Sequence, residues 1–292
     1  MDGTFDSAPL LFEQLYVIRA PLGESAVSCV YAFLPNKSQS SYMYEELLIA
    51  VINRCNTLGF QLDPTTVITD YEKASINAIS STLGPHVRCQ GCFYHLTQST
   101  WRKIQSLGLV TTYRSDEDVK LFCGILDGLA FLPVDDVAAS LDQLKENIPE
   151  GLDDLVAYFE ATYVNGTYRK LQRPPCLDGR IPPIRMRRIP PLFPAELWNV
   201  HLTTLGGGSR TNNLCEAWNR AFSSLLRISH PTIWRALEHL CLDHSNVKTA
   251  LLQYSRGQPP KKRVRKATKD LQERLYNLCA SYDDNHVYVR AP

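Results

Sequence analysis

Three acidic residues, far apart along the chain, could together hold divalent cations: Asp2, Asp70 and Glu216. Asp2 precedes a Gly-Thr turn, Asp70 ends a predicted strand, and Glu216 lies in the first turns of a predicted helix. Carboxylates from separate strands and a helix are what two-metal phosphoryl transfer requires, with two ions about 3.5–4 Å apart. Such ions activate a water or a 3′-hydroxyl and stabilise the leaving oxygen. Oxygen ligands favour Mg²⁺ or Mn²⁺ over zinc.

The segment around Asp70 predicts a strand, a helix, a second strand and a further helix. The β-branched run 67–69 leads into Asp70, and Gly84-Pro85 ends the helix that follows. The second strand is expected over residues 86–89. A carboxylate at the carboxyl end of a strand, beside the start of a helix, is placed where α/β sheets hold metals or polar ligands. The alternative is that Asp70 only caps the next helix.

The N-terminal third predicts the remaining part of a mixed sheet. Two apolar runs, 10–20 and 27–34, are expected to form a hairpin that turns at Gly23. A helix should follow, capped by Ser40 or Ser41. The resulting order of hairpin, helix, strand, helix, strand and helix is typical of a mixed α/β sheet with an antiparallel start and a parallel continuation.

The pattern over residues 115–164 is helical, with acids in the first turn and no strand runs. Near the C-terminus, a helix is expected to begin at Thr211 or Asn212 and to carry Glu216. A further helix is expected to start at Thr232. The polar residues of the helix that carries Glu216 lie on adjacent faces at i,i+3 and i,i+4 spacing. These polar residues are Asn212, Asn213, Glu216 and Asn219.

Two basic segments are candidates for contact with nucleic acid. The first lies in the Pro- and Arg-rich stretch 171–194, which cannot form a regular helix. It predicts a phosphate-contacting loop, or alternatively a solvated linker. The second, within 259–266, is typical of a nuclear-import or nucleic-acid-binding tail, or of a solvated tail. The basic residues are Arg180, Arg185, Arg187 and Arg188 in the first segment, and Lys261, Lys262, Arg263, Arg265 and Lys266 in the second.

Length, charge, apolar runs and cysteine content limit the classes of protein to which this chain can belong. The 292 residues suffice for one large domain or two small ones, and the net charge of +1 limits any nucleic-acid surface to a local patch. No apolar run reaches the roughly 18 residues of a membrane helix, and the N-terminus has no signal-peptide pattern. Nine scattered cysteines indicate reduced thiols. Cys89, Cys92 and His95 offer three zinc ligands without an evident fourth, so packed thiols are favoured over a structural zinc site.

Eight segments, in order, resemble the Mutator-like element (MULE) transposase domain, an RNase H-like DDE catalytic core. They extend over roughly residues 2–240, and their order makes the resemblance specific. The segments are DGTFDSAPLLFEQLYVI, FLPNKSQSSY, ITDYEKA, CQGCFYHLTQSTWRKIQSLGL, YFEATYV, FPAELWNV, SRTNNLCEAWNRAF and SHPTIW.

The resemblance implies that Asp2, Asp70 and Glu216 are the catalytic acids and metal ligands. It implies Mg²⁺ or Mn²⁺ as cofactor and no organic cofactor. DNA is the implied partner, self-association is compatible with the family, and no membrane contact is expected. The implied activity is DNA cleavage and strand transfer in the nucleus, by a partial or domesticated transposase. The alternative is a catalytically silent, domesticated DNA-binding or chromatin-associated protein, and a third reading is a product that does not fold stably.

Further residues match family motifs beside the acids. Cys92 and His95 match a Cys-x-x-His motif, with positioning or DNA contact as the expected role. A packed thiol and a hydrogen-bonded histidine are the alternative. Arg210, Asn212 and Asn213 match the block before the catalytic glutamate and are expected to orient it or to contact phosphate.

The resemblance also divides the chain into four parts. Residues 1–110 would form the N-terminal part of the RNase H-like core, and 111–205 a helical insertion with the Pro/Arg-rich segment. Residues 206–250 would carry the catalytic glutamate, and 251–292 a basic tail. In this family the first catalytic aspartate follows several apolar strand residues, and that strand is central in the sheet. Since only Met1 precedes Asp2, we expect a truncated first core strand and a loosely held Asp2.

Overall fold

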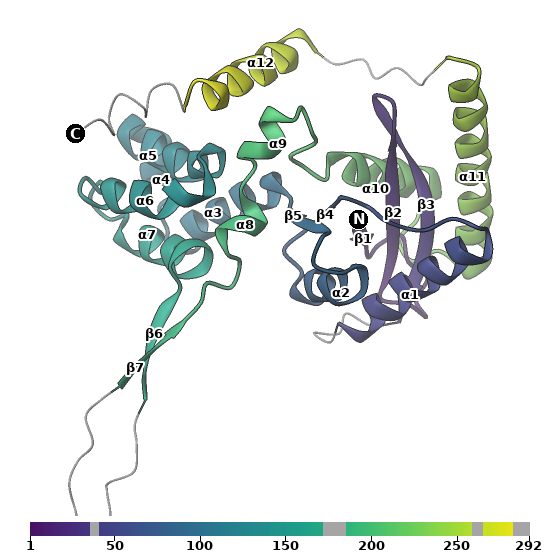
Figure 1. Ribbon diagram of the computed structural model, residues 1–292, viewed down its shortest axis with the longest axis horizontal. Helices are drawn as coiled ribbons and strands as arrows, with labels where there is room; N and C mark the ends of the chain where they lie inside the picture. The colour runs from purple at the N-terminus through teal and green to yellow at the C-terminus, as the bar shows by residue number, and fades with distance from the viewer. Residues whose placement is uncertain (36–40, 172–184, 259–264, 283–292) are drawn as a thin grey trace, which may run out of the picture. The chain divides into compact units, whose positions relative to one another are not determined.

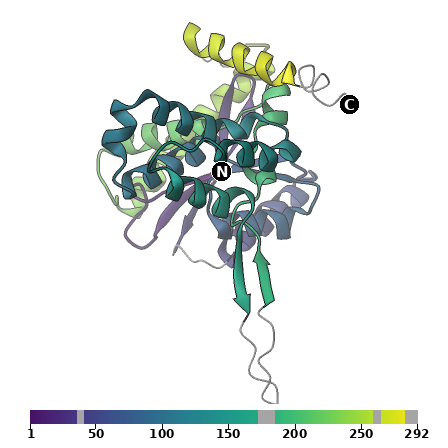
Figure 2. The same ribbon diagram turned by 90° about the vertical axis from the view of Figure 1, so that its left-hand side faces the viewer.

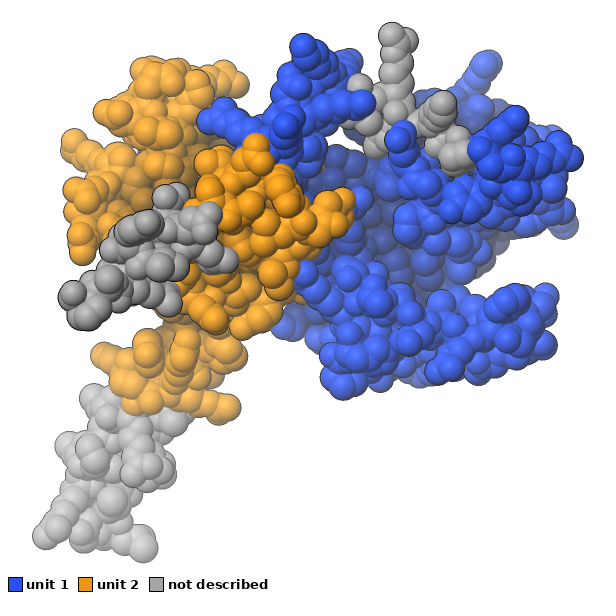
Figure 3. All heavy atoms as spheres, turned by 45° about the horizontal axis from the view of Figure 1, so that its top comes forward, with its two compact units in different colours: residues 1–92, 209–275 blue, residues 93–208, 276–292 orange. Residues whose placement is uncertain are grey.

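The computed structural model describes residues 1–35, 41–171, 185–258 and 265–282 (Figure 1). The chain forms two compact units, coloured separately in Figure 3. Unit 1 comprises Met1–Cys92 and Ser209–Leu275, and unit 2 comprises Phe93–Gly208 and Tyr276–Pro292. Helices and small sheets together confirm the mixed α/β class.

Unit 1 begins with a three-stranded antiparallel sheet of order β1-β2-β3. In this sheet Asp2 pairs with Val17, and β2 and β3 form the predicted hairpin. Gly23 adopts a φ of 61° at its turn, a conformation that glycine reaches without strain. The strands are β1 (Asp2–Thr4), β2 (Gln14–Leu22) and β3 (Ser25–Leu34).

A parallel pair of strands, β4 (Thr66–Thr69) and β5 (Arg88–Gly91), continues unit 1. Helix α1 (Tyr42–Thr57) precedes the pair, and α2 (Lys73–Leu83) connects its strands. This confirms the predicted alternation around Asp70. Strand β5 begins two residues later than expected, because residues 84–87 form a turn closed by a hydrogen bond of 3.3 Å from the Val87 N–H to the Gly84 carbonyl.

Alternate side chains of β2 pack into two different apolar clusters of unit 1. Tyr16 belongs to the cluster formed with α1 and α2, whereas Leu15 and Val17 pack with Trp218 and Phe222 of α10. This follows from the two-residue period of a strand, and it covers the sheet on both faces. The helices that complete unit 1 are α10 (Asn213–Leu226), α11 (Ile233–Ser255) and α12 (Lys266–Ala280), the last as far as Leu275.

Unit 2 is mainly helical, as predicted for residues 115–164. Helix α5 starts where the acids suggested, since the Asp116 side chain accepts hydrogen bonds from the backbone of Asp118 and Val119. The helices are α3 (Phe93–Ser106), α4 (Val110–Ser115), α5 (Glu117–Gly128), α6 (Val137–Lys145), α7 (Asp153–Phe159), α8 (Ala195–Trp198) and α9 (His201–Leu205). They are joined by 3₁₀ turns at Leu129–Phe131 and Val134–Asp136 and by a π-helical turn at Glu160–Val164.

An antiparallel hairpin leaves the helical body of unit 2 (Figure 1). It consists of β6 (Thr167–Leu171) and β7 (Arg185–Ile189). The expectation of a loop or linker is therefore wrong for residues 185–189, because this stretch pairs with a strand that lies before the Pro-rich residues. None of the described helices is both long and apolar enough to cross a membrane.

Candidate functional site

Asp2 is the first residue of β1, and its side chain is buried, with 8% of the residue exposed. Its Oδ1 accepts a hydrogen bond of 3.0 Å from the Gly3 N–H, and its Oδ2 accepts one of 2.8 Å from Asn219 Nδ2. The expectation of a loosely held Asp2 is wrong. Pairing with β2 and the bond from α10 hold it in place.

The start of β1 is also bound to two other elements of unit 1. The Met1 ammonium donates to the Ile68 carbonyl of β4 over 2.6 Å. The Met1 carbonyl accepts a hydrogen bond of 2.9 Å from Asn212 Nδ2. Asn212 is the N-cap residue of α10, yet its side chain makes no capping bond. Its amide instead joins β1 to the helix that carries Glu216.

Asp70 directly follows β4, as predicted, and is partly buried. The Thr69 hydroxyl lies 3.5 Å from Asp70 Oδ1, at the limit of a hydrogen bond. The N-cap residue of α2 is Glu72 rather than Asp70, so the helix-cap alternative does not describe this carboxylate. Glu216 lies in the first turn of α10 and is also partly buried.

The three acids interact electrostatically. Burial and then the Asp70 carboxylate raise the pKa of Asp2 to about 7, and Glu216 contributes in the same direction. The Met1 ammonium and the Gly3 N–H oppose this rise. The fold therefore brings carboxylates from β1, from the end of β4 and from α10 into one electrostatic neighbourhood. A cation placed among them would offset both the burial and the repulsion that keep Asp2 partly protonated near neutral pH.

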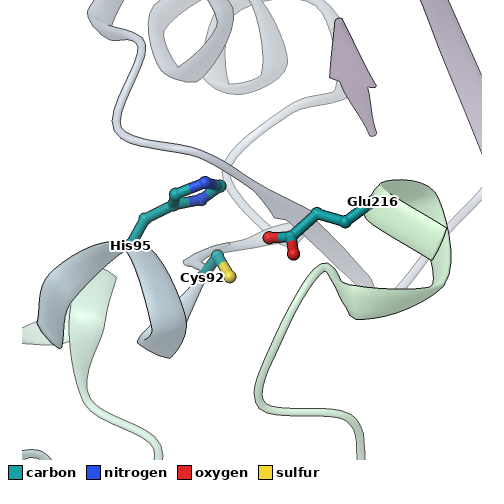
Figure 4. A group of neighbouring side chains, drawn as sticks. All are labelled: Cys92, His95 and Glu216. Atoms are coloured by element: carbon teal, nitrogen blue, oxygen red, sulfur yellow. The ribbon is translucent and has the colours of Figure 1, made fainter. Parts of the chain in front are cut away.

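Cys92 follows β5 and is fully buried. Its N–H donates to the Thr69 carbonyl over 2.9 Å, and its Sγ accepts a hydrogen bond of 3.2 Å from the Asn212 N–H. A carboxylate oxygen of Glu216 lies within 4.8 Å of this sulfur. Figure 4 shows both side chains together with His95, which follows three residues later. A buried thiol cannot contact DNA, so positioning and simple packing are the two roles left for Cys92, and its functional role stays a prediction.

The other residues that match the family motifs differ in their surroundings. His95 lies in the first turn of α3 in unit 2, partly buried, with its ring 5.7 Å from that of Tyr94 between centroids. Arg210 donates to Gln272 Oε1 of α12 over 2.6 Å, and Asn213 is exposed at the start of α10. Their functional roles stay predictions.

Sequence reasoning did not include Asn219 among the site residues. The available signal was its position three residues after Glu216, which places the two side chains on neighbouring parts of one helix face. What the sequence could not reveal is its partner, because Asp2 lies 217 positions away.

Only part of the predicted basic set falls on described residues. Arg185 begins β7, and Arg187 and Arg188 are exposed on that strand, in unit 2. Arg265 is exposed, and the exposed Lys266 begins α12. Outside the described residues lie Arg180, Lys261, Lys262 and Arg263.

Comparison with known proteins agrees with the resemblance seen in the sequence. Residues 1–99 match the family model of the MULE transposase domain. This confirms the predicted family for residues 1–99, and the broader RNase H-like DDE superfamily is consistent with it. The matched segment contains Asp2, Asp70, Cys92 and His95, whereas Glu216 lies beyond it. Neither the curated proteins nor the solved structures contain a match to the chain.

Proposed function

We propose, from the MULE transposase domain that residues 1–99 represent, that unit 1 is the catalytic core of a transposase acting on DNA in the nucleus. Its reaction would be DNA cleavage and strand transfer by phosphoryl transfer. The observation that carries this proposal is the convergence of three carboxylates in unit 1, where Asp70 and Glu216 add to the burial that raises the pKa of Asp2. An aspartate with a pKa of about 7, beside two further acids, is typical of a functional site.

The proposal includes an RNase H-like sheet. The hydrogen bond from the Met1 ammonium to the Ile68 carbonyl places the start of β1 beside β4. Combined with the two observed sheets, this contact supports the strand order β3-β2-β1-β4-β5. In that order β1 is central, as expected for the strand that carries the first catalytic aspartate.

The donor set fits the divalent cations that this family implies. Asp2, Asp70 and Glu216 offer hard oxygen ligands of the kind that Mg²⁺ and Mn²⁺ prefer. Bound ions would activate the attacking oxygen and stabilise the leaving oxygen. The chain itself orients the ligands. Asn219 holds Oδ2 of Asp2, and Asn212 fixes the start of α10 through its bonds to Met1 and Cys92.

A second candidate is a catalytically silent domain that binds DNA. The exposed arginines of β7 favour it, since they can neutralise phosphates without any metal. The two candidates differ in one measurable property. Catalysis requires the acids and a divalent cation, whereas binding through arginines persists in EDTA.

The test is nicking of supercoiled plasmid by the full chain with Mg²⁺ or Mn²⁺, comparing the parent with Asp70→Asn. A matched control is Asp6→Asn, which also removes one charge but alters an exposed carboxylate close to Asp2 in sequence. We expect metal-dependent nicking in the parent and the control, and its loss in Asp70→Asn. Equal nicking by all three proteins would refute the catalytic role. DNA binding in EDTA without nicking by the parent would support the silent alternative.

A further inference from the structure

The β6–β7 hairpin is a narrow ribbon with an unusual set of exposed side chains. Figures 1 and 2 both show it leading away from the helices of unit 2. In its register Arg169 lies opposite Arg187, Tyr168 opposite Arg188, and Lys170 opposite Met186. Of these two strands, only β7 carries basic residues that were predicted from the sequence to contact nucleic acid. Pairing with β6 adds two cations, Arg169 and Lys170, and the aromatic ring of Tyr168.

The charge of the ribbon is uniformly positive. Its described basic side chains, Arg169, Lys170, Arg187 and Arg188, are all exposed. The strand segments 167–171 and 185–189 contain no aspartate or glutamate. Within the described part of the chain, none of these four cations forms an ion pair. At the base, Arg188 Nε and Nη2 each lie 3.4 Å from the Asn165 carbonyl.

This arrangement costs the free protein stability. Like charges directly opposite each other on neighbouring strands, as with Arg169 and Arg187, are destabilising. A two-stranded ribbon without a covering layer is marginally stable by itself. Packing therefore offers no reason for a pair of opposed arginines on such a ribbon, whereas a polyanion lying along it would compensate their charge.

The two faces of the ribbon differ, because side chains alternate along a strand. One face carries Tyr168 and Lys170 of β6 with Met186 and Arg188 of β7. Tyr168 is 66% exposed and Met186 is 53% exposed, so this face offers apolar and aromatic surface between cations. The opposite face presents Arg169 and Arg187. A mixed face of this kind can contact base edges as well as phosphates.

The ribbon is fixed at its base, which distinguishes it from a linker. Gly166 has a φ of +74°, and a Cβ there would lie 2.1 Å from the Ile189 carbonyl oxygen, so only glycine allows the strands to approach this closely. The N–H groups of Asn165 and Gly166 both donate to the Glu160 carbonyl. After β7, the Phe193 N–H donates to the Thr162 carbonyl over 3.0 Å.

Buried aromatic rings also hold the end of the ribbon that joins the helical body of unit 2. Tyr163 stacks on Phe193 with 5.9 Å between ring centroids. The Trp198 indole, fully buried, donates to the Tyr163 carbonyl over 2.8 Å. The helical body of unit 2 thus anchors both ends of the ribbon and leaves its basic strands exposed.

We propose that the β6–β7 ribbon is a binding arm for duplex DNA that lies in the major groove. The major groove, about 12 Å wide, admits a two-stranded ribbon, whereas the minor groove of about 6 Å does not. The four cations would contact phosphates, and Tyr168 and Met186 would lie against base edges. The inference rests on the proposed function for the choice of DNA as the polyanion, and otherwise on the ribbon alone.

The test is the salt dependence of duplex DNA binding by the full chain in EDTA, where no metal-dependent reaction occurs. The variant Arg169→Gln/Arg187→Gln removes the opposed pair. The control Arg102→Gln/Arg114→Gln removes two other exposed arginines of unit 2, so both variants change the net charge equally. Each lost phosphate contact lowers the slope of log K against log salt by about 0.9. We expect a decrease of about 1.8 for the ribbon variant and none for the control.

Two competition experiments test the groove. Methyl green, a major-groove ligand, should compete with the protein, and distamycin, a minor-groove ligand, should not. An A-form RNA duplex should bind more weakly than DNA, because its major groove is too deep and narrow for side chains to read. Equal slope changes in the two double variants, competition by distamycin, or equal affinity for the RNA duplex would each overturn the proposal.

Failure of this inference can be distinguished from failure of the proposed catalysis. A ribbon variant with a reduced salt slope supports the binding arm even if Asp70→Asn nicks like the parent. Conversely, loss of nicking in Asp70→Asn stands even if the ribbon variant binds DNA normally. Thermal unfolding verifies that the ribbon variant is folded. Its melting temperature should equal or exceed that of the parent, since the substitution removes repulsion.

Discussion

Replacing Asp2 by asparagine should stabilise the metal-free protein while removing one ligand of the proposed divalent cation site. The carboxyl has a pKa of about 7 in the folded chain, compared with an ordinary aspartate pKa of 3.8. Between these values the folded state binds the proton more tightly than the unfolded state does, so stability falls as pH rises from about 4 to 7. Asn219 can adapt to the new amide by turning its own, because Asn219 Oδ1 is buried without a hydrogen-bond partner among the described residues.

The size of the effect follows from the difference in pKa. About three pKa units, at 1.36 kcal/mol each, set an upper limit of about 4 kcal/mol at pH 8. Since some relaxation accompanies the substitution, we expect Asp2→Asn to be about 2–4 kcal/mol more stable than the parent at pH 8. Near pH 4 the parent carboxyl is protonated in the folded state, and the difference should nearly vanish.

The assay is urea unfolding in EDTA at pH 4, 6 and 8, with Asp6→Asn as the exposed control. The same series with Mn²⁺ should stabilise the parent by RT ln(1 + [Mn²⁺]/Kd), about 2.7 kcal/mol at one hundred times Kd, and should leave Asp2→Asn unchanged. The reasoning fails if Asp2→Asn is no more stable than the parent at pH 8. It also fails if Asp2→Asn exceeds the parent in stability by the same amount at pH 4 as at pH 8. Equal stabilisation of the parent and Asp2→Asn by Mn²⁺ would contradict it as well.

Two further substitutions test other parts of the structure. Burial raises the pKa of Asp127 in unit 2 to about 6, although the Thr100 hydroxyl donates to it over 2.8 Å. Asp127→Asn should therefore stabilise unit 2 by about 1–3 kcal/mol at pH 8 and have little effect at pH 4, measured by urea unfolding. Asn219→Ala removes the donor to Asp2 Oδ2, a bond to a charged group worth about 1.5–3 kcal/mol. Mn²⁺ affinity, measured by calorimetry, should fall at least several-fold, and an unchanged affinity would contradict the positioning role.

Local sequence signals were enough to predict the elements around Asp70. A β-branched run ends at this residue, and Gly84 stops the helix that follows, so strand, acid and helix could be placed without knowing any distant partner. The β2–β3 hairpin was predicted for the same reason, since two apolar runs flank a turn at Gly23. In each case the residues that determine the element lie within it or beside it.

Pairing between distant segments explains what could not be predicted. The burial of Asp2 depends on β2 and on Asn219, and neither contact leaves a pattern near the N-terminus. Strand β7 was missed because its partner, β6, lies before the Pro-rich stretch whose composition suggested a loop. Helix α12 was missed because a run of basic residues precedes it and the chain there was interpreted as a tail.

The division of unit 1 into two chain segments has a consequence for its synthesis. The Leu15 and Val17 face of β2 needs α10 as its cover, yet all of Phe93–Gly208 is made between them. At about 5–20 residues per second, the ribosome takes roughly ten seconds or more to reach α10. During that interval the apolar face of the nascent sheet lacks its native partner, and the Asp2–Asn219 bond cannot form. Asp2, Asp70 and Glu216 can therefore come together only late in synthesis, after Phe93–Gly208 of unit 2 has been made.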